Sequence, residues 1–110
     1  MKDSSVLLHV SPRANVPSIL SRGVQPHYSK GRRAESWLVA PSKRSWAVSH
    51  VKRRHQTGAV CVFRVLVPRR LLTRRSRGTW TTAHPISPSS ILSVGIGELL
   101  AAAEGAAFNP

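Results

Sequence analysis

Short apolar runs, separated by polar segments that contain Pro and Gly, divide this sequence into its elements. The first run, residues 6–10, predicts a buried strand in which His9 is the one polar side chain, and the Ser-Pro pair after it is expected to end the strand. Asn15 and Gly23 then bracket a short helix, because Asn favours the position before a helix and Gly the position after it. The chain is therefore predicted to open with a strand, a turn and a short helix.

The same order returns after a polar, basic segment at residues 25–36, which predicts a loop. Residues 37–40 predict a second short strand, which Pro41 ends. A second helix is expected from Ser42 to about His55, with apolar residues on one side and cations in its last turn, where the helix dipole favours them. The first half of the chain is thus predicted to hold two strand–helix units.

Strand signals dominate the second half of the chain. Residues 59–67 are the strongest of them, an apolar run with Arg64 as its only charged member. Short strands with two early helices predict one α+β domain over residues 1–110, with its core at about 6–94. The remaining expectations are a basic turn at 74–78, a partly exposed strand at 79–82, a segment at 89–94 that leads into a last strand, a short helix at 99–103 and a fraying tail at 104–110.

The charge of the chain is strongly one-sided. Seventeen Lys and Arg residues face four Asp and Glu residues, so the formal net charge is +13. Such a charge attracts polyanions, and the guanidinium group of Arg, the commoner cation here, can grip a phosphate through two hydrogen bonds. The composition therefore predicts nucleic acid or another polyanion as a partner. The alternative is that the charge only keeps the protein soluble.

Several other functions find no support in the sequence. The single cysteine, Cys61, cannot form an internal disulfide, and its apolar surroundings predict a buried, inert thiol. Five scattered His residues without a Cys or carboxylate cluster argue against a metal site, so no metal ligand is assigned. No apolar run is long enough for a transmembrane helix, and neither a signal peptide nor a phosphate-binding glycine loop is visible. We expect a cytoplasmic protein that does not associate with membranes.

Basic clusters with aromatic residues among them favour nucleic-acid binding. Cations that follow a phosphate backbone, together with rings that stack on bases, are typical of proteins that bind single strands. Trp37 and Trp46 are rings of this kind, and the alternative is that both belong to the core. No helix-turn-helix, zinc-finger or RNA-recognition motif is visible, so no sequence preference is predicted. The cations assigned to this interface are Lys52, Arg53, Arg54, Arg74, Arg75 and Arg77.

Several short motifs occur along the chain in a distinctive order. They are Leu8-His9-Val10-Ser11-Pro12, Ile19-Leu20, Gly23-Val24, residues 37–40 and 62–67, and Ile86-Ser87-Pro88-Ser89-Ser90-Ile91. This succession resembles the ADP-ribosyltransferase superfamily over roughly residues 6–94. The resemblance implies a small two-layer split β-sheet with two short helices.

The resemblance also implies that the chain binds NAD. In the family, the first-strand histidine bonds the ribose beside nicotinamide, which gives His9 a role in cofactor binding and catalysis and makes Ser11 a second contact. Trp37 stands where the family often has a tyrosine that stacks on the nicotinamide ring. Arg32 and Arg33 are assigned to the pyrophosphate because guanidinium groups pair well with phosphate. The alternative for His9 is a strand histidine that a backbone partner satisfies.

The sequence departs from the family at the catalytic carboxylate. Members carry a Glu on a late strand, whereas the matching region, residues 78–84, has none. Thr82 and His84 stand near the expected place and are the remaining catalytic candidates. Three outcomes stay open: a degenerate binder, a His- and Arg-based site like that of the similar NAD-dependent RNA 2'-phosphotransferases, or a carboxylate supplied by Glu35 or Glu98.

Two functions follow as hypotheses. The first is an ADP-ribosyltransferase-like domain that binds NAD and acts on or docks to nucleic acid, an acceptor that suits the charge of +13 better than a protein does. The alternative is a non-enzymatic basic nucleic-acid-binding module. Binding to DNA or RNA that depends on salt but not on NAD would distinguish the alternative from the first hypothesis.

Overall fold

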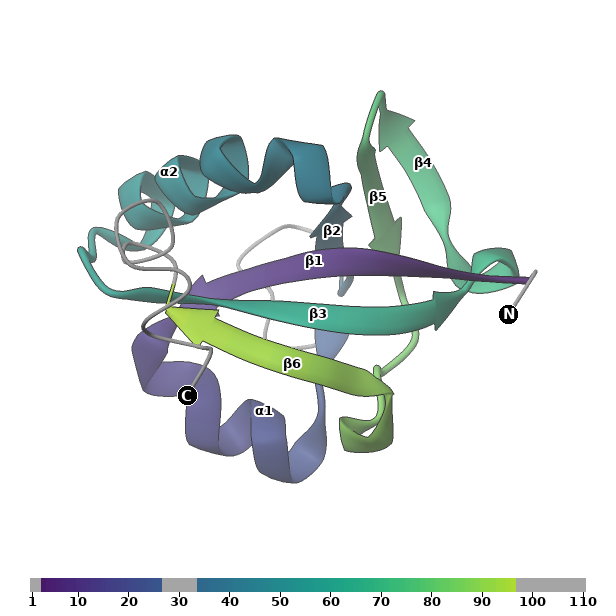
Figure 1. The fold of residues 1–110 in the computed structure, drawn as a ribbon, viewed down its shortest axis with the longest axis horizontal. Coiled ribbons are helices and arrows are strands. Elements are labelled where there is room, and N and C mark those ends of the chain that lie inside the picture. The colour runs from purple at the N-terminus through teal and green to yellow at the C-terminus, as the bar shows by residue number, and fades with distance from the viewer. Residues whose placement is uncertain (1–2, 27–33, 97–110) are drawn as a thin grey trace.

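Six strands and two helices are present in the computed structural model of this chain, which describes residues 3–26 and 34–96 (Figure 1). In chain order the strands are β1 (Ser4–Pro12), β2 (Ser36–Val39), β3 (Val60–Pro68), β4 (Thr73–Ser76), β5 (Thr79–Thr82) and β6 (Ile91–Ile96). The helices are α1 (Val16–Arg22) and α2 (Arg44–His55), which follow short 3₁₀ turns. The expected α+β class is confirmed.

All strand pairs are antiparallel and form one sheet in the order β4-β5-β2-β1-β3-β6. β1 pairs with β3 along its whole length, whereas β1 and β2 share the single pair Leu8↔Val39. The sheet therefore has two halves, β4-β5-β2 and β1-β3-β6, whose strands run in clearly different directions in Figure 1. The six strands thus belong to one sheet, and its two halves meet at a single residue pair.

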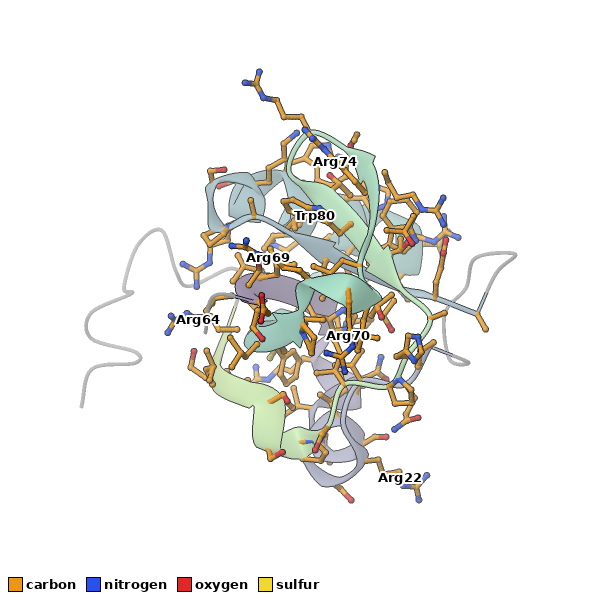
Figure 2. The ribbon with its side chains drawn as sticks, turned by 90° about the vertical axis from the view of Figure 1, so that its right-hand side faces the viewer. Arg22, Arg64, Arg69, Arg70, Arg74 and Trp80 are labelled. Carbon is orange, nitrogen blue, oxygen red and sulfur yellow. The ribbon has the colours of Figure 1, made fainter. Side chains whose placement is uncertain are left out.

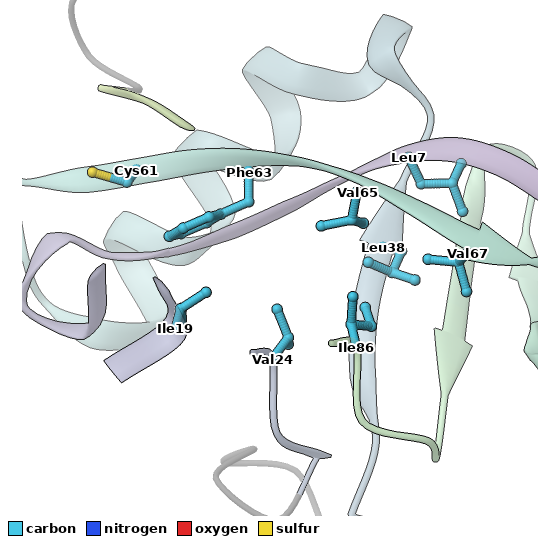
Figure 3. Close-up of a cluster of buried hydrophobic side chains, with 9 residues drawn as sticks. All are labelled: Leu7, Ile19, Val24, Leu38, Cys61, Phe63, Val65, Val67 and Ile86. Carbon is cyan, nitrogen blue, oxygen red and sulfur yellow. The ribbon is translucent and has the colours of Figure 1, made fainter. Parts of the chain in front are cut away.

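The two faces of the sheet carry separate apolar clusters, because successive residues of a strand point to opposite faces. Leu7 belongs to the cluster on the α1 side, where Ile19 of α1 packs against a β3 strand that contributes the fully buried Phe63 (Figure 3). Leu8 belongs to the other cluster, which includes Ala47 of α2. The two helices thus cover opposite faces, as Figure 1 shows.

Two local expectations need correction. β1 is longer than the predicted residues 6–10, because it begins at Ser4 and ends only at Pro12, opposite Val60. Since Pro12 is the last residue of the strand, its missing N–H interrupts no ladder of hydrogen bonds. The basic turn expected at 74–78 is instead mostly the edge strand β4, which pairs with β5 around a turn at Gly78. Exposed cations are compatible with an edge strand, because their side chains remain in solvent.

Some expectations lie outside the described residues. These are the short helix at 99–103, the tail at 104–110 and residues 27–33 of the basic loop. Within the described residues, neither helix has the length and apolar character needed to cross a bilayer.

Candidate functional site

A cavity of about 1390 Å³ opens where β1 and β2 separate. Beyond the pair Leu8↔Val39, the two strands share no further pair within the described residues, although both continue for several residues. One wall of the cavity comes from β1 and α1, and the other comes from β2 and α2. The opening is therefore a direct result of the split in the sheet.

His9 lies in this lining, half-buried and beside the gap between the strands. Its Nδ1 is 3.1 Å from the backbone carbonyl oxygen of Trp37. Because a carbonyl oxygen only accepts hydrogen bonds, Nδ1 carries the proton and Nε2 presents a lone pair. The predicted alternative, a histidine held by a backbone partner, thus accounts for one ring nitrogen, while no described residue is hydrogen-bonded to the other.

The pKa of His9 is lowered from its ordinary value, and the larger cause is burial, which disfavours the charged imidazolium. The hydrogen bond to the Trp37 carbonyl acts in the opposite direction but does not overcome burial. The ring contacts Phe63, the residue opposite it on β3, with 6.3 Å between the ring centroids. His9 is therefore a neutral side chain at pH 7 that can accept a hydrogen bond from a ligand hydroxyl.

Ser11 follows His9 on the same face of β1 and also lines the cavity. It is buried, and its Oγ accepts a hydrogen bond of 3.0 Å from Nδ2 of Asn15. Asn15 was expected to cap α1, but its side chain makes no capping hydrogen bond and instead holds Ser11. The hydroxyl proton of Ser11 is not used in this bond, so the cavity lining combines an acceptor at His9 with a donor at Ser11.

Trp37 and Trp46 both line the cavity, and their exposed fractions are 48% and 49%. The alternative that both belong to the core is therefore wrong. Trp46 stacks on His50 with ring centroids 5.2 Å apart and an interplanar angle of 11°. The Nζ of Lys43 lies 5.8 Å from the centroid of Trp46. Trp46, His50 and Arg54 give the α2 side of the cavity an aromatic, cationic surface.

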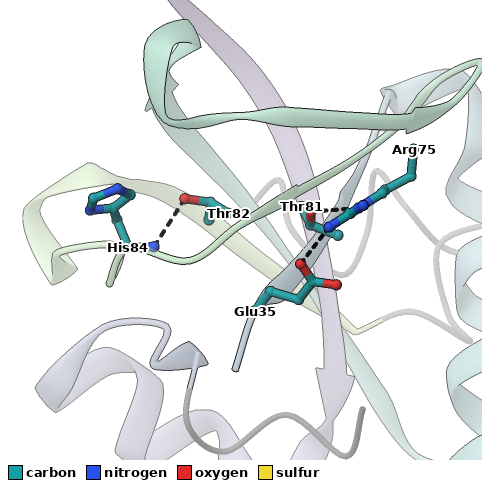
Figure 4. Close-up of polar contacts among 5 residues, drawn as sticks. All are labelled: Glu35, Arg75, Thr81, Thr82 and His84. Carbon is teal, nitrogen blue, oxygen red and sulfur yellow. Dashed lines mark hydrogen bonds and ion pairs between the residues drawn. The ribbon is translucent and has the colours of Figure 1, made fainter. Parts of the chain in front are cut away.

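An ion pair that the sequence did not reveal joins Glu35 to Arg75, and both residues line the cavity (Figure 4). Nη2 of Arg75 donates to Oε2 of Glu35 at 2.8 Å, and its Nε donates to Oγ1 of Thr81 at 3.0 Å. Arg75 was assigned to nucleic acid, but here it holds a carboxylate. Glu35 is the only acidic residue among the described residues that lines the cavity.

Thr82 and His84, the remaining catalytic candidates, do not line the cavity. Thr82 is buried, and its Oγ1 accepts a hydrogen bond of 3.2 Å from the backbone N–H of His84 (Figure 4). His84 is exposed on the turn that follows β5. Thr82 thus ends β5 and holds the start of the turn that contains His84, and neither residue lines the cavity that contains His9.

The remaining cations of the assigned interface lie on two elements. Arg54 lines the cavity, Arg53 and Lys52 share the last turn of α2, and Arg74 and Arg77 are exposed on the hairpin of β4 and β5. Arg32 and Arg33 lie outside the described residues. In Figure 2, labelled arginines spread from Arg22 at one end of the molecule to Arg74 at the other, so the charge is not confined to one patch.

Within residues 3–26 and 34–96, no three His, Cys, Asp or Glu side chains come together as a metal site would require. Cys61 is buried in the cluster of Figure 3, in agreement with its apolar surroundings in the sequence. No protein-family model and no curated protein matches this sequence. The geometry of the cavity is therefore the basis for the functional interpretation.

Proposed function

We propose that this chain is an ADP-ribosyltransferase-like domain that binds NAD in the cavity and acts on or docks to nucleic acid. The observation that carries the proposal is the neutral His9, which is held through Nδ1 by the Trp37 carbonyl and lines the same cavity as two exposed indoles. A dinucleotide offers the matching groups, namely ribose hydroxyls that donate to His9 and flat rings that stack on tryptophan.

The size of the cavity supports more than one ligand. Its volume of about 1390 Å³ exceeds the range of about 300–1,000 Å³ that is usual for drug-sized ligands. A dinucleotide would leave room for part of an acceptor. NAD is then a substrate that meets its acceptor within one opening.

Glu35 is the candidate for the carboxylate that the late strand lacks. Transfer breaks the bond between nicotinamide and the C1' carbon of the ribose, forms a bond from an acceptor oxygen or nitrogen to C1', and releases the acceptor's proton. Positive charge develops on the ribose as nicotinamide leaves, and a nearby carboxylate stabilises such charge. Arg75 fixes the orientation of Glu35, with 2.8 Å between Nη2 and Oε2, while it offsets part of the negative charge.

Calorimetric titration with NAD tests the binding. The wild-type protein should bind NAD, and His9→Ala should weaken binding about tenfold, since a lost hydrogen bond contributes on the order of 1.5 kcal/mol. His84→Ala is the matched control, because His84 is exposed and does not line the cavity, and its affinity should equal that of the wild type. Absence of binding to the wild type, or normal binding by His9→Ala, would contradict the proposal.

Release of nicotinamide, measured in the same samples, separates an enzyme from a binder. Glu35→Gln should bind NAD but release nicotinamide far more slowly than the wild type. A wild type that binds NAD without any release would identify the domain as a degenerate binder.

The alternative function is a non-enzymatic basic nucleic-acid-binding module. It is favoured by the lack of a carboxylate on β5 and by the exposed cations of the β4–β5 hairpin. This function predicts that an oligonucleotide binds with steep salt dependence and that NAD changes nothing.

A further inference from the structure

The side of α2 that lines the cavity carries an ordered aromatic pair. Trp46, His50 and Arg54 are spaced four residues apart, so they lie along one side of the helix. The ring of His50 stacks on Trp46 at a centroid distance of 5.2 Å, although the indole remains half exposed. An exposed ring that a neighbour already holds in place loses little conformational freedom when another flat ring stacks on it.

Cations flank this pair at both ends. The segment from Pro41 to His55 contains five Lys and Arg residues and no acidic residue. Lys43 lies beside the indole at the start of the segment, next to the β4–β5 turn, where the N–H of Ala40 donates to the carbonyl of Gly78 at 2.9 Å. From Lys43 to Arg54 the helix rises about 16 Å, so positive charge stands before and after the aromatic pair.

We infer that this side of α2, which we name the α2 platform and define as Lys43, Trp46, His50 and Arg54, binds single-stranded nucleic acid by stacking one base on Trp46. The inference rests on the proposed role in nucleic-acid binding and assigns that role to a surface. Lys43 and Arg54 lie about 16 Å apart along the helix, a spacing that suits a strand with several phosphates better than a dinucleotide with two adjacent ones. An acidic protein would satisfy the charge but would leave the indole without a matching ring.

The position of the α2 platform adds a geometric consequence. Trp46, His50 and Arg54 line the same cavity as His9. A strand bound to the α2 platform therefore presents a nucleotide at the opening where NAD is proposed to bind. This places the acceptor and the NAD site along one continuous surface.

The test uses a fluorescein-labelled ten-nucleotide oligouridylate without NAD. Its binding is measured by fluorescence anisotropy between about 50 and 200 mM NaCl, a range that includes physiological salt. Trp46→Ala should weaken binding about 5- to 100-fold, the usual effect of one stacked base, and should leave the salt slope unchanged. Lys43→Ala combined with Arg54→Ala should lower the log–log slope by about 1.4, close to 0.7 for each lost phosphate contact.

Leu92→Ala is the control for removal of an exposed apolar side chain, because Leu92 is 48% exposed on β6 and does not line the cavity. It should bind like the wild type. Equal affinities of Trp46→Ala and Leu92→Ala would overturn the inference. So would a deca-glutamate peptide that binds as tightly as the oligonucleotide, since it has similar charge and no rings. If the oligonucleotide results are as expected but the wild type does not bind NAD, only the proposed NAD site is refuted.

Discussion

At the scale of single residues, His9 shows how a polar side chain is accommodated in an apolar strand. Its Nδ1 bonds the Trp37 carbonyl at a point where β1 and β2 no longer pair, so the imidazole stands in for a missing backbone partner. Phe63 covers the ring from the neighbouring strand. Burial keeps the ring neutral, and the hydrogen bond occupies Nδ1, so Nε2 has no hydrogen-bond partner among the described residues.

The lowered pKa of His9 predicts a pH dependence of stability. The unfolded chain takes up a proton near the ordinary pKa of about 6.5, whereas folded His9 does so only at lower pH. The contribution of neutral His9 to the free energy of unfolding is therefore complete above about pH 6.5. It is lost as the pH falls through the lowered pKa of the folded state. Urea unfolding of the wild type between pH 8 and pH 5 should show this loss, and His9→Gln should show less of it.

His84→Gln removes an exposed histidine outside the cavity, so it should keep the full loss of stability. Identical pH profiles for His9→Gln and the wild type would contradict the assignment of the effect to His9.

The sequence identified several residues that line the cavity but did not reveal the ion pair among them. His9, Ser11 and Trp37 lie in short local motifs, and all three line the cavity. The pair of Glu35 and Arg75 could not be predicted, because its members are 40 residues apart and meet only through the pairing of β2, β5 and β4. Side-chain pairs that depend on strand order carry no local signal.

At the scale of elements, strong apolar periodicity was a reliable guide and weak periodicity was not. β3 was predicted nearly to its bounds because an uninterrupted apolar run needs a buried strand. β4 was missed because all four of its residues are exposed, so its position is set by pairing with β5 and not by burial. The position of β4 could therefore be predicted only together with β5, the strand that pairs with it.

The end of α1 provides a test at this scale. Gly23 ends the helix with φ at 82°, and a Cβ there would collide with the carbonyl oxygen of Ile86, which accepts the Val24 N–H at 2.9 Å. Gly23→Ala should therefore lower the free energy of unfolding by about 1–3 kcal/mol or more, through backbone strain and a displaced bridge. Urea denaturation measures this change.

Gly58→Ala is the matched control, because a Cβ at Gly58 would meet no atom within 4 Å. Its stability should equal or slightly exceed that of the wild type, since alanine restricts the unfolded chain. A Gly23→Ala variant as stable as Gly58→Ala would show that the contact between Val24 and Ile86 does not constrain the fold.

At the scale of the whole molecule, composition and element order predicted the α+β class, but strand order required the structure. No local pattern states that β2 lies between β5 and β1 or that its pairing with β1 stops after one residue pair. The charge of +13, in contrast, is a global quantity that can be read from the sequence in full.

The net charge predicts that salt stabilises the fold. Like charges repel in the compact state, and ions screen this repulsion. The melting temperature should rise by roughly 4 °C or more, equivalent to about 1 kcal/mol, between low salt and about 0.3 M NaCl. Arg64→Glu with Arg70→Glu, both exposed, reduces the charge from +13 by four to +9 and should shrink the rise. A melting temperature that falls with salt would contradict this reasoning.

The single pair between Leu8 and Val39 has a consequence for how tolerant the opening is to change. The route of the backbone creates the hollow, whereas the side chains on its rim determine what enters it. Substitutions of these rim side chains can therefore change which ligand the cavity selects without changing the backbone fold. A domain of this kind is a suitable starting point for engineering receptors for nucleotide-sized molecules.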